Sequence, residues 1–191
     1  MRRFNEASLE QVVVERLEEN GFTYVYGDDI EREATDVLIC EDLVAYLKSR
    51  YPELTEAERA RFIKTLDNYS AGAGALYDSN RDIFRIISTG IIFHRDDPQD
   101  KDVLIRLIDY DAPDTNLFKV VNQFTVKGAS ETRIPDVVVF INGLPVVVME
   151  LKTPVKEEIT IEDAFKQLTV RYRRDIPELS NTTLLSSSRT A

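Results

Sequence analysis

The segment RIPDVVVFINGLPVVVMELKTP, residues 133–154, constrains the fold of this chain more than any other. It consists of two runs rich in valine, isoleucine and leucine that meet at Asn-Gly, residues 142–143, the strongest short-range signal for a β-hairpin. The pattern predicts two buried antiparallel strands. Three charged residues interrupt them, Asp136 in the first strand and Glu150 and Lys152 in the second, and a buried hairpin needs a reason to carry such charges.

The spacing of these charges makes a statement about geometry. Side chains alternate along a strand, so we expect Glu150 and Lys152 on the same face. A hairpin that turned on Asn-Gly alone would pair Asp136 with Met149, facing away from Glu150. A three-residue loop over 142–144, or one β-bulge, would instead set Asp136 beside Glu150. We infer this second register, which brings two carboxylates together.

Two adjacent carboxylates repel each other, and a divalent cation between them would relieve the repulsion. A lysine alongside would hold a water molecule or a developing negative charge. This layout suits metal-assisted cleavage of a phosphodiester, in which Asp136 and Glu150 bind Mg²⁺ and Lys152 orients or activates the nucleophile. The alternative is a structural salt bridge between Lys152 and one carboxylate, which would leave the other acid uncompensated. The spacing leaves both interpretations open.

The first half of the chain is expected to be helical. Apolar residues recur with helical spacing from Leu9 onward, after a capping-box pattern that begins at Ser8, and a second capping box begins at Thr55. The predicted helices cover residues 8–19, 41–50, 55–67 and a shorter segment within 80–90. The glycine-containing segment 69–80 is interpreted as a flexible connector.

The second half changes to a β pattern and then returns to a helix. Strands are predicted at 91–94, 102–109, 117–126 and in the hairpin, and the short polar turns between them favour antiparallel neighbours. A second Pro-Asp pair, at 113–114, lies in such a turn. A helix capped by Thr160 should run to about Asp175 and stop at Ile176-Pro177. The polar tail either holds one short strand or is disordered.

Composition narrows the function further. The 191 residues, 43% of them hydrophobic, suffice for one compact domain, and no apolar run approaches the length of a membrane span. We therefore expect a soluble, cytoplasmic protein without a membrane partner. The single cysteine, Cys40, and single histidine, His94, exclude a zinc site built from those residues, so a metal needs oxygen ligands. The net charge of −10 argues against coating nucleic acid by bulk charge.

Four segments of the chain together resemble the N-terminal nuclease region of the R subunit of type I restriction-modification enzymes, within the PD-(D/E)xK nuclease superfamily. They are ASLEQVVVERLEENGFTYVYG (7–27), VVNQFTVKG (120–128), the hairpin segment (133–154) and IEDAFKQLTVRYRRDIPEL (161–179). The resemblance implies an α/β restriction-endonuclease-like core, a mostly antiparallel or mixed sheet flanked by helices. It also implies Mg²⁺-dependent cleavage of double-stranded DNA, with Asp136 and Glu150 as metal ligands and Lys152 as the catalytic lysine.

The same resemblance implies a larger assembly. In that family the nuclease region precedes an ATP-driven helicase motor and works with methyltransferase and specificity subunits. This chain has no Gly-x-x-x-x-Gly-Lys-Ser/Thr motif, so ATP is expected only for a full-length subunit. We predict a single nuclease domain over 1–180, with its helical part at about 1–90 and its catalytic sheet and helix at about 91–180. The tail, 181–191, is predicted to be weakly structured.

The helix after the lysine departs from the family pattern in one respect. Members of this type carry Gln-x-x-x-Tyr there, whereas Gln167 and Tyr172 lie five residues apart. A π-bulge would absorb the inserted residue and return both side chains to one face. We therefore predict an irregular turn near 169–171 with Gln167 and Tyr172 both facing the site. The alternative is a regular helix with Tyr172 turned to solvent.

Other candidates rest on weaker patterns. Glu10 matches a family acid that would reach the metal, although a lone glutamate on an amphipathic helix is more often solvated. His94 is expected to end a strand rather than act as a base. A set of cations near the predicted helix would contact DNA phosphates or merely complement the helix dipole; it comprises Lys156, Lys166, Arg171, Arg173 and Arg174. For the whole chain, the alternative to a nuclease is a catalytically silent module of the same fold that binds DNA or docks subunits.

Overall fold

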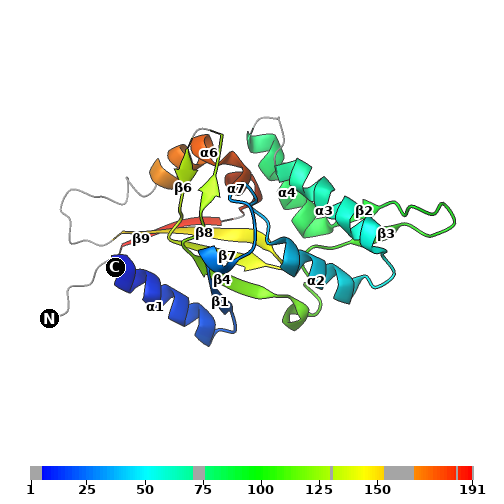
Figure 1. The fold of residues 1–191 in the computed structure, drawn as a ribbon, viewed down its shortest axis with the longest axis horizontal. Helices are drawn as coiled ribbons and strands as arrows, with labels where there is room; N and C mark the ends of the chain where they lie inside the picture. Colours follow the sequence, from blue (N-terminus) through cyan, green and yellow to red (C-terminus); the bar gives the residue numbers. More distant parts are fainter. Residues whose placement is uncertain (1–5, 71–75, 130, 153–165, 184, 191) are drawn as a thin grey trace.

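A five-stranded mixed sheet runs through the middle of the molecule, with helices on both faces (Figure 1). The computed structural model describes residues 6–70, 76–129, 131–152, 166–183 and 185–190. Its α-helices are α1 (Glu6–Glu19), α2 (Cys40–Arg50), α3 (Glu56–Ser70), α4 (Leu76–Thr89), α6 (Tyr172–Asp175) and α7 (Pro177–Thr182). The shorter helical turns are η1 (Gly27–Asp29), η2 (Pro113–Thr115) and the π-helix η3 (Gln167–Arg171). The strands are β1 (Thr23–Tyr26), β2 (Ile91–Phe93), β3 (Val103–Ile105), β4 (Phe118–Asn122), β5 (Val126–Lys127), β6 (Thr132–Arg133), β7 (Val137–Ile141), β8 (Leu144–Lys152) and β9 (Leu185–Thr190).

The large sheet has the strand order β1-β4-β7-β8-β9. The central pairs, β4 with β7 and β7 with β8, are antiparallel, whereas both outer strands run parallel to their neighbours. Two small two-stranded sheets, β2-β3 and β5-β6, lie outside it. The mixed α/β fold class predicted from the sequence is confirmed.

One face of the sheet is covered by α1 (Figure 1). Leu9 and Val14 of this helix pack on Val120, Val137 and Leu151 of three neighbouring strands, and Val13 and Leu17 are partly buried against them. Val12, which the helical spacing placed on the apolar face, is instead 42% exposed, so the predicted stripe is buried only in part. The helix begins at Glu6 rather than after Ser8. The predicted capping box at Ser8 is therefore wrong, because that residue already lies inside the helix.

The opposite face carries α6 and α7, and α2, α3 and α4 extend the core beside them (Figure 1). At the start of α3 the predicted capping box is confirmed: the Glu58 amide donates to Thr55 Oγ1 at 3.2 Å, and the Thr55 amide donates to Glu58 Oε2 at 2.8 Å. The helix α4 begins at Leu76, earlier than predicted. Of the predicted connector 69–80, residues 69–70 belong to α3 and residues 76–80 to α4. The remaining residues, 71–75, lie outside the described ranges.

The predicted strands form, several of them shorter than expected. The 102–109 strand is only Val103–Ile105, and Pro113-Asp114 lies in the turn η2, as predicted. His94 follows β2 with an exposed side chain and contacts Asp102, which confirms it as a strand-end residue. The parallel edge strand β1 was not predicted. Of the two alternatives for the tail, the structure shows the strand: β9 pairs with β8, so the prediction of a weakly structured 181–191 is corrected.

The described helices include none that is long and apolar enough to cross a membrane.

Candidate active site

A β-bulge sets the register of the central hairpin. Next to the turn, Ile141 pairs with Leu144 and Phe140 pairs with Pro145. The register then shifts by one residue, so that Val139 pairs with Val147. Val146 is the extra residue of the bulge. Continuing the shifted register past Val137 and its partner Met149 brings Asp136 beside Glu150. The inferred register is confirmed, and of the two devices considered it is the bulge, not a longer loop, that produces it.

The turn itself is the two-residue Asn-Gly turn. Asn142 and Gly143 have φ values of 52° and 82°, the left-handed conformation that a type I′ turn requires at both positions. A side chain on Gly143 would also collide with the carbonyl oxygen of Ile39. The turn therefore packs tightly against the residue before α2. This contact fixes the position of the end of the hairpin from which both site strands extend.

The two predicted metal ligands are held by different partners. Asp136 is partly buried, and its Oδ2 accepts a hydrogen bond from the Leu151 amide at 2.6 Å. Glu150 is only 2% exposed. Its Oε1 accepts from Gln167 Nε2 at 2.7 Å and its Oε2 accepts from the Tyr172 hydroxyl at 2.7 Å. Each oxygen of this buried carboxylate thus has a defined donor, as a buried charge requires.

The helix that supplies these donors contains the predicted irregularity. Residues Gln167–Arg171 form a π-helix, and α6 continues from Tyr172. The wider π turn brings Gln167 and Tyr172 together although they are five residues apart, with 3.3 Å between Nε2 and the hydroxyl oxygen. The predicted π-bulge is confirmed, and the alternative of a solvent-facing Tyr172 is wrong, since this residue is 3% exposed.

The environment keeps Tyr172 a hydrogen-bond donor. Burial, and then the neighbouring negative charge of Glu150, raise the pKa of the Tyr172 phenol well above its ordinary value. The hydroxyl therefore stays protonated over the physiological range and can donate to Glu150 but cannot act as a base there.

The donor chemistry of this pair fits Mg²⁺. Hard oxygen ligands suit that ion, which commonly takes one or two carboxylates and completes its shell with water and substrate phosphate. A carboxylate has about four lone-pair directions, so the hydrogen bonds to Glu150 do not exhaust its capacity as a ligand. Within the described ranges no group of three or more histidine, cysteine, aspartate or glutamate residues is suited to a metal. Among the described acids, Asp136 and Glu150 are therefore the two that this site offers to a metal.

The other predicted site residues are placed less fully. Lys152 ends β8, two positions after Glu150; the structure describes its backbone and not its side chain. Lys156 lies outside the described residues. Glu10 is not joined to Asp136 or Glu150: its Oε1 accepts from Asn122 Nδ2 at 2.6 Å, on the α1 side of the sheet.

The predicted DNA-contacting cations behave differently from one another. Lys166, Arg171 and Arg173 are exposed next to or within the π-helix and α6, which suits contact with a polyanion. Arg174 instead forms an ion pair with Asp175, with 2.6 Å between Nε and Oδ1, although 66% of its side chain stays exposed. Both interpretations of the set, a phosphate-contacting patch and a helix end rich in cations, remain compatible with this exposure.

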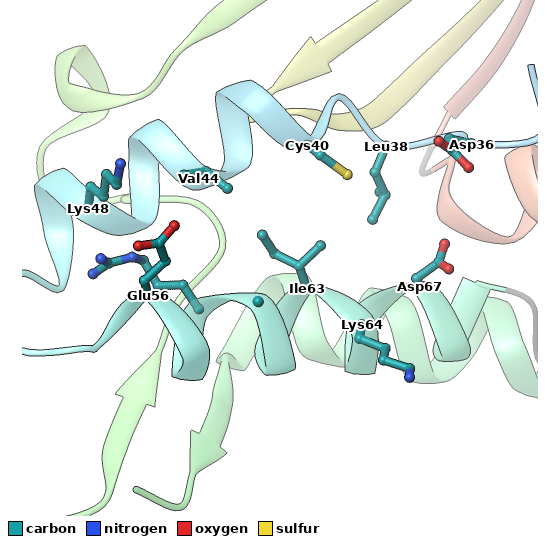
Figure 2. Close-up of a pocket in the computed structure, with 11 residues that line it drawn as sticks. Asp36, Leu38, Cys40, Val44, Lys48, Glu56, Ile63, Lys64 and Asp67 are labelled. Carbon is teal, nitrogen blue, oxygen red and sulfur yellow. The ribbon is translucent and has the colours of Figure 1, made fainter. Parts of the chain in front are cut away.

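A cavity of about 470 Å³ lies elsewhere, between α2 and α3. Figure 2 shows an apolar middle flanked by charged side chains at both ends. The apolar part includes Leu38, Val44 and Ile63, and the charged ends include Lys48 and Glu56 on one side and Asp36 and Asp67 on the other. None of the residues that line this cavity belongs to the carboxylate site, so it is a separate feature of the fold.

The mixed sheet flanked by helices, with Asp136 beside Glu150 and a glutamine and a tyrosine gripping the glutamate, has the layout of a nuclease-like core. Comparison with known proteins agrees with this class. A family model described as "Type I restriction enzyme R protein N terminus (HSDR_N)" matches residues 3–187. The chain belongs to this family.

The individual relatives are also named as type I restriction enzyme subunits. The chain is 29% identical over 185 residues to the type I restriction enzyme HindI endonuclease subunit of Haemophilus influenzae, an alignment covering 92% of this chain and 17% of the relative. It is 30% identical over 182 residues to a putative type I restriction enzyme MjaIXP endonuclease subunit of Methanocaldococcus jannaschii, covering 90% and 17%. The chain thus spans about a sixth of the length of these curated relatives.

Three residues in contact with the predicted site or close to it were not identified from the sequence. Arg133 and the buried Asp175 form an ion pair across 42 positions of the chain, and no local pattern links residues so far apart. Asn122, which binds Glu10 and also accepts from the Tyr24 hydroxyl at 2.9 Å, was hidden for the same reason. The predicted strand, 117–126, placed Asn122 in its interior, whereas in the structure Asn122 ends β4.

Proposed function

We propose that this chain is a Mg²⁺-dependent endonuclease module that cleaves DNA phosphodiesters within a type I restriction-modification complex. The observation that carries the proposal is that two separate elements, β7 and the π-helix, position groups around Glu150. The bulge sets Glu150 beside Asp136, and the π-helix turns Gln167 and Tyr172 onto its two oxygens. Family membership supports the same function, because the matched relatives are named endonuclease subunits.

In this proposal the site residues divide into metal ligands and a catalytic lysine. Asp136, held by the Leu151 amide, and Glu150, held by Gln167 and Tyr172, are the metal ligands. Mg²⁺ bound there would polarise the scissile phosphate and lower the pKa of a bound water. Lys152, the next residue but one along β8, orients the attacking water and offsets negative charge that develops on the phosphate.

The wider assembly belongs to the proposal as well. The substrate is double-stranded DNA, and Lys156, Lys166, Arg171 and Arg174 are proposed to contact its phosphates. The methyltransferase and specificity subunits of a type I complex are the partners, and the cytoplasm is where such a complex meets DNA. ATP would serve a motor in a longer chain, since the present residues contain no phosphate-binding loop of that kind.

Metal binding can be tested without turnover. Mg²⁺ or Mn²⁺ should raise the melting temperature of the chain, because a ligand at one hundred times its Kd adds about 2.7 kcal/mol to the free energy of unfolding. Asp136→Asn and Glu150→Gln should each abolish that shift. If either variant keeps the full shift, that carboxylate is not a ligand.

Catalysis needs a separate measurement. Nicking of supercoiled plasmid should require Mg²⁺ and should disappear in Lys152→Ala, whereas Lys101→Ala, which removes an exposed lysine beyond β2, should leave it unchanged. Thermal melting of both variants shows whether the fold persists. DNA binding with metal but no nicking by the parent chain, alone or assembled with its partner subunits, would favour the catalytically silent alternative.

A further inference from the structure

The β5-β6 hairpin meets the end of α6 through an ion pair. Arg133 Nε and Nη2 donate to Asp175 Oδ2 at 2.9 and 2.6 Å, and the Asp175 side chain is only 1% exposed. The two backbones also touch, because a side chain on Gly128 would collide with the Asp175 carbonyl oxygen. The hairpin and the helix are therefore held together by an ion pair whose carboxylate is buried and by close backbone packing.

A short and rigid backbone segment connects each residue of this pair to the carboxylate site. Asp175 follows Tyr172 by three residues in α6, less than one helical turn. Arg133 precedes Asp136 by three residues, and the buried Pro135 lies between them. Proline fixes its own φ and keeps the preceding residue extended. The backbone from Arg133 to Asp136 therefore has little conformational freedom.

These connections close a ring around the site. One side of the ring is the Leu151 amide donating to Asp136, and another is the Tyr172 hydroxyl donating to Glu150, the residue before Leu151. The ion pair supplies the remaining side. The ring runs through Arg133, Asp136, Leu151, Glu150, Tyr172 and Asp175.

We propose that Arg133 is a positioning residue: its ion pair with Asp175 sets where Asp136 stands relative to Glu150. Arg133 does not touch the reacting atoms. Its planar guanidinium directs two N–H groups at one carboxylate oxygen, a geometry that lysine cannot reproduce. The consequence for metal binding rests on the proposed function, in which Asp136 and Glu150 are the ligands. The mechanical consequence, a fixed Asp136, does not.

The mechanical part is tested on the metal-free chain by hydrogen exchange of the Leu151 amide, whose acceptor is Asp136. In Arg133→Met this amide should exchange faster, because Asp136 is no longer held against it. The matched control is Arg50→Met, which removes an arginine from another nearly buried aspartate, Asp109, at 2.9 Å. Loss of Leu151 protection in Arg133→Met alone supports the proposal. Equal loss in both variants, or loss in neither, overturns it.

The functional part is tested by calorimetric titration with Mn²⁺ below the melting temperature of every variant. Arg133→Met should bind Mn²⁺ about tenfold more weakly or worse, the usual effect of removing a residue that orients a ligand, whereas Arg50→Met should match the parent. Arg133→Lys keeps the charge and should still bind more weakly than the parent. Parental affinity in both Arg133 variants overturns the effect on metal binding. A parent that binds no metal contradicts the proposed function instead, and the Leu151 measurement still decides the positioning role.

Discussion

At the scale of single residues, the site depends on how one buried glutamate is oriented. Glu150 is almost inaccessible to solvent, and its two described donors, Gln167 and Tyr172, are both neutral. Neutral donors fix the direction of a carboxylate while preserving its negative charge, which is what a metal ligand requires. The π turn lets both donors reach the same acceptor although they lie five positions apart in the sequence.

Removing one donor should therefore weaken metal binding more than it weakens the fold. We expect Tyr172→Phe to lower the affinity for Mn²⁺ by about tenfold or more. The control is Tyr46→Phe, which removes a buried hydroxyl that donates to the Arg106 carbonyl at 3.0 Å. It should cost about 1 kcal/mol of stability without changing the affinity. Calorimetric titration and urea unfolding measure the two quantities, and a parental affinity for Tyr172→Phe would exclude its hydroxyl from the site.

At the scale of elements, the central hairpin is anchored at its turn as well as at its site end. The Asn142 side chain is fully buried. Its Nδ2 donates to the Leu107 carbonyl and to Asn116 Oδ1, both at 2.8 Å, and its Oδ1 accepts from the Leu117 amide at 2.7 Å. One turn residue therefore ties the hairpin to the preceding loop, in addition to supplying the left-handed backbone that the turn needs.

These two roles of Asn142 can be separated by a pair of variants. Asn142→Gly removes the side-chain hydrogen bonds and should cost about 3 kcal/mol, because buried backbone groups lose their partners. Asn142→Ala removes the same bonds and adds left-handed strain, so it should be less stable than the glycine variant by roughly a further 1 kcal/mol. Urea unfolding with an unchanged m-value measures the difference. Equal stability of the two variants would show that the backbone conformation carries no cost.

The elements also show which parts of the structure a sequence can predict. The bulge was predictable because it follows from counting the residues between Asp136 and Glu150, two side chains that must meet. The π turn was predicted by comparing the spacing of Gln167 and Tyr172 with the Gln-x-x-x-Tyr pattern of the family that the sequence resembles. The capping box at Thr55 was predictable because its contacts are local. The strands β1 and β9 were missed or left undecided because their parallel pairing depends on partners far along the chain, which impose a strand on a polar segment such as LSSSRT.

At the scale of the whole molecule, the net charge of −10 means that carboxylates outnumber cations, so stability depends on which acids are paired with a cation. Buried acids join separate elements: Asp175 joins α6 to β6, and Glu58 joins the start of α3 to the loop after β2. Glu58 is 1% exposed and accepts from Arg95 Nε at 2.7 Å and from the Asp96 amide at 3.0 Å. These pairs stabilise the folded state only while the carboxylates are ionised.

The pH dependence of stability follows from these pairs. The hydrogen bond from Arg95, reinforced by backbone donors, lowers the pKa of Glu58 from 4.5 to about 2, and the guanidinium groups of Arg174 and Arg133 lower that of Asp175 from 3.8 to about 2. Both pKa values are lower in the folded state than in the unfolded chain. The stabilisation is therefore complete above pH 4.5 and is lost as the pH falls towards 2.

We accordingly expect the melting temperature to fall steeply between pH 4.5 and about 2. Glu58→Gln should be less stable than the parent by roughly 3–5 kcal/mol at neutral pH, because its amide cannot replace the ion pair with Arg95. The deficit should shrink on acidification, since the parent then loses the same ion pair.

The control is Glu19→Gln, which removes an exposed partner of Arg16. Its stability should change with pH in parallel with that of the parent, because such surface pairs contribute little. Calorimetric melting over this pH range measures all three chains, and a deficit for Glu58→Gln that stays constant with pH would mean that the lost stability comes from packing rather than from the ionised carboxylate.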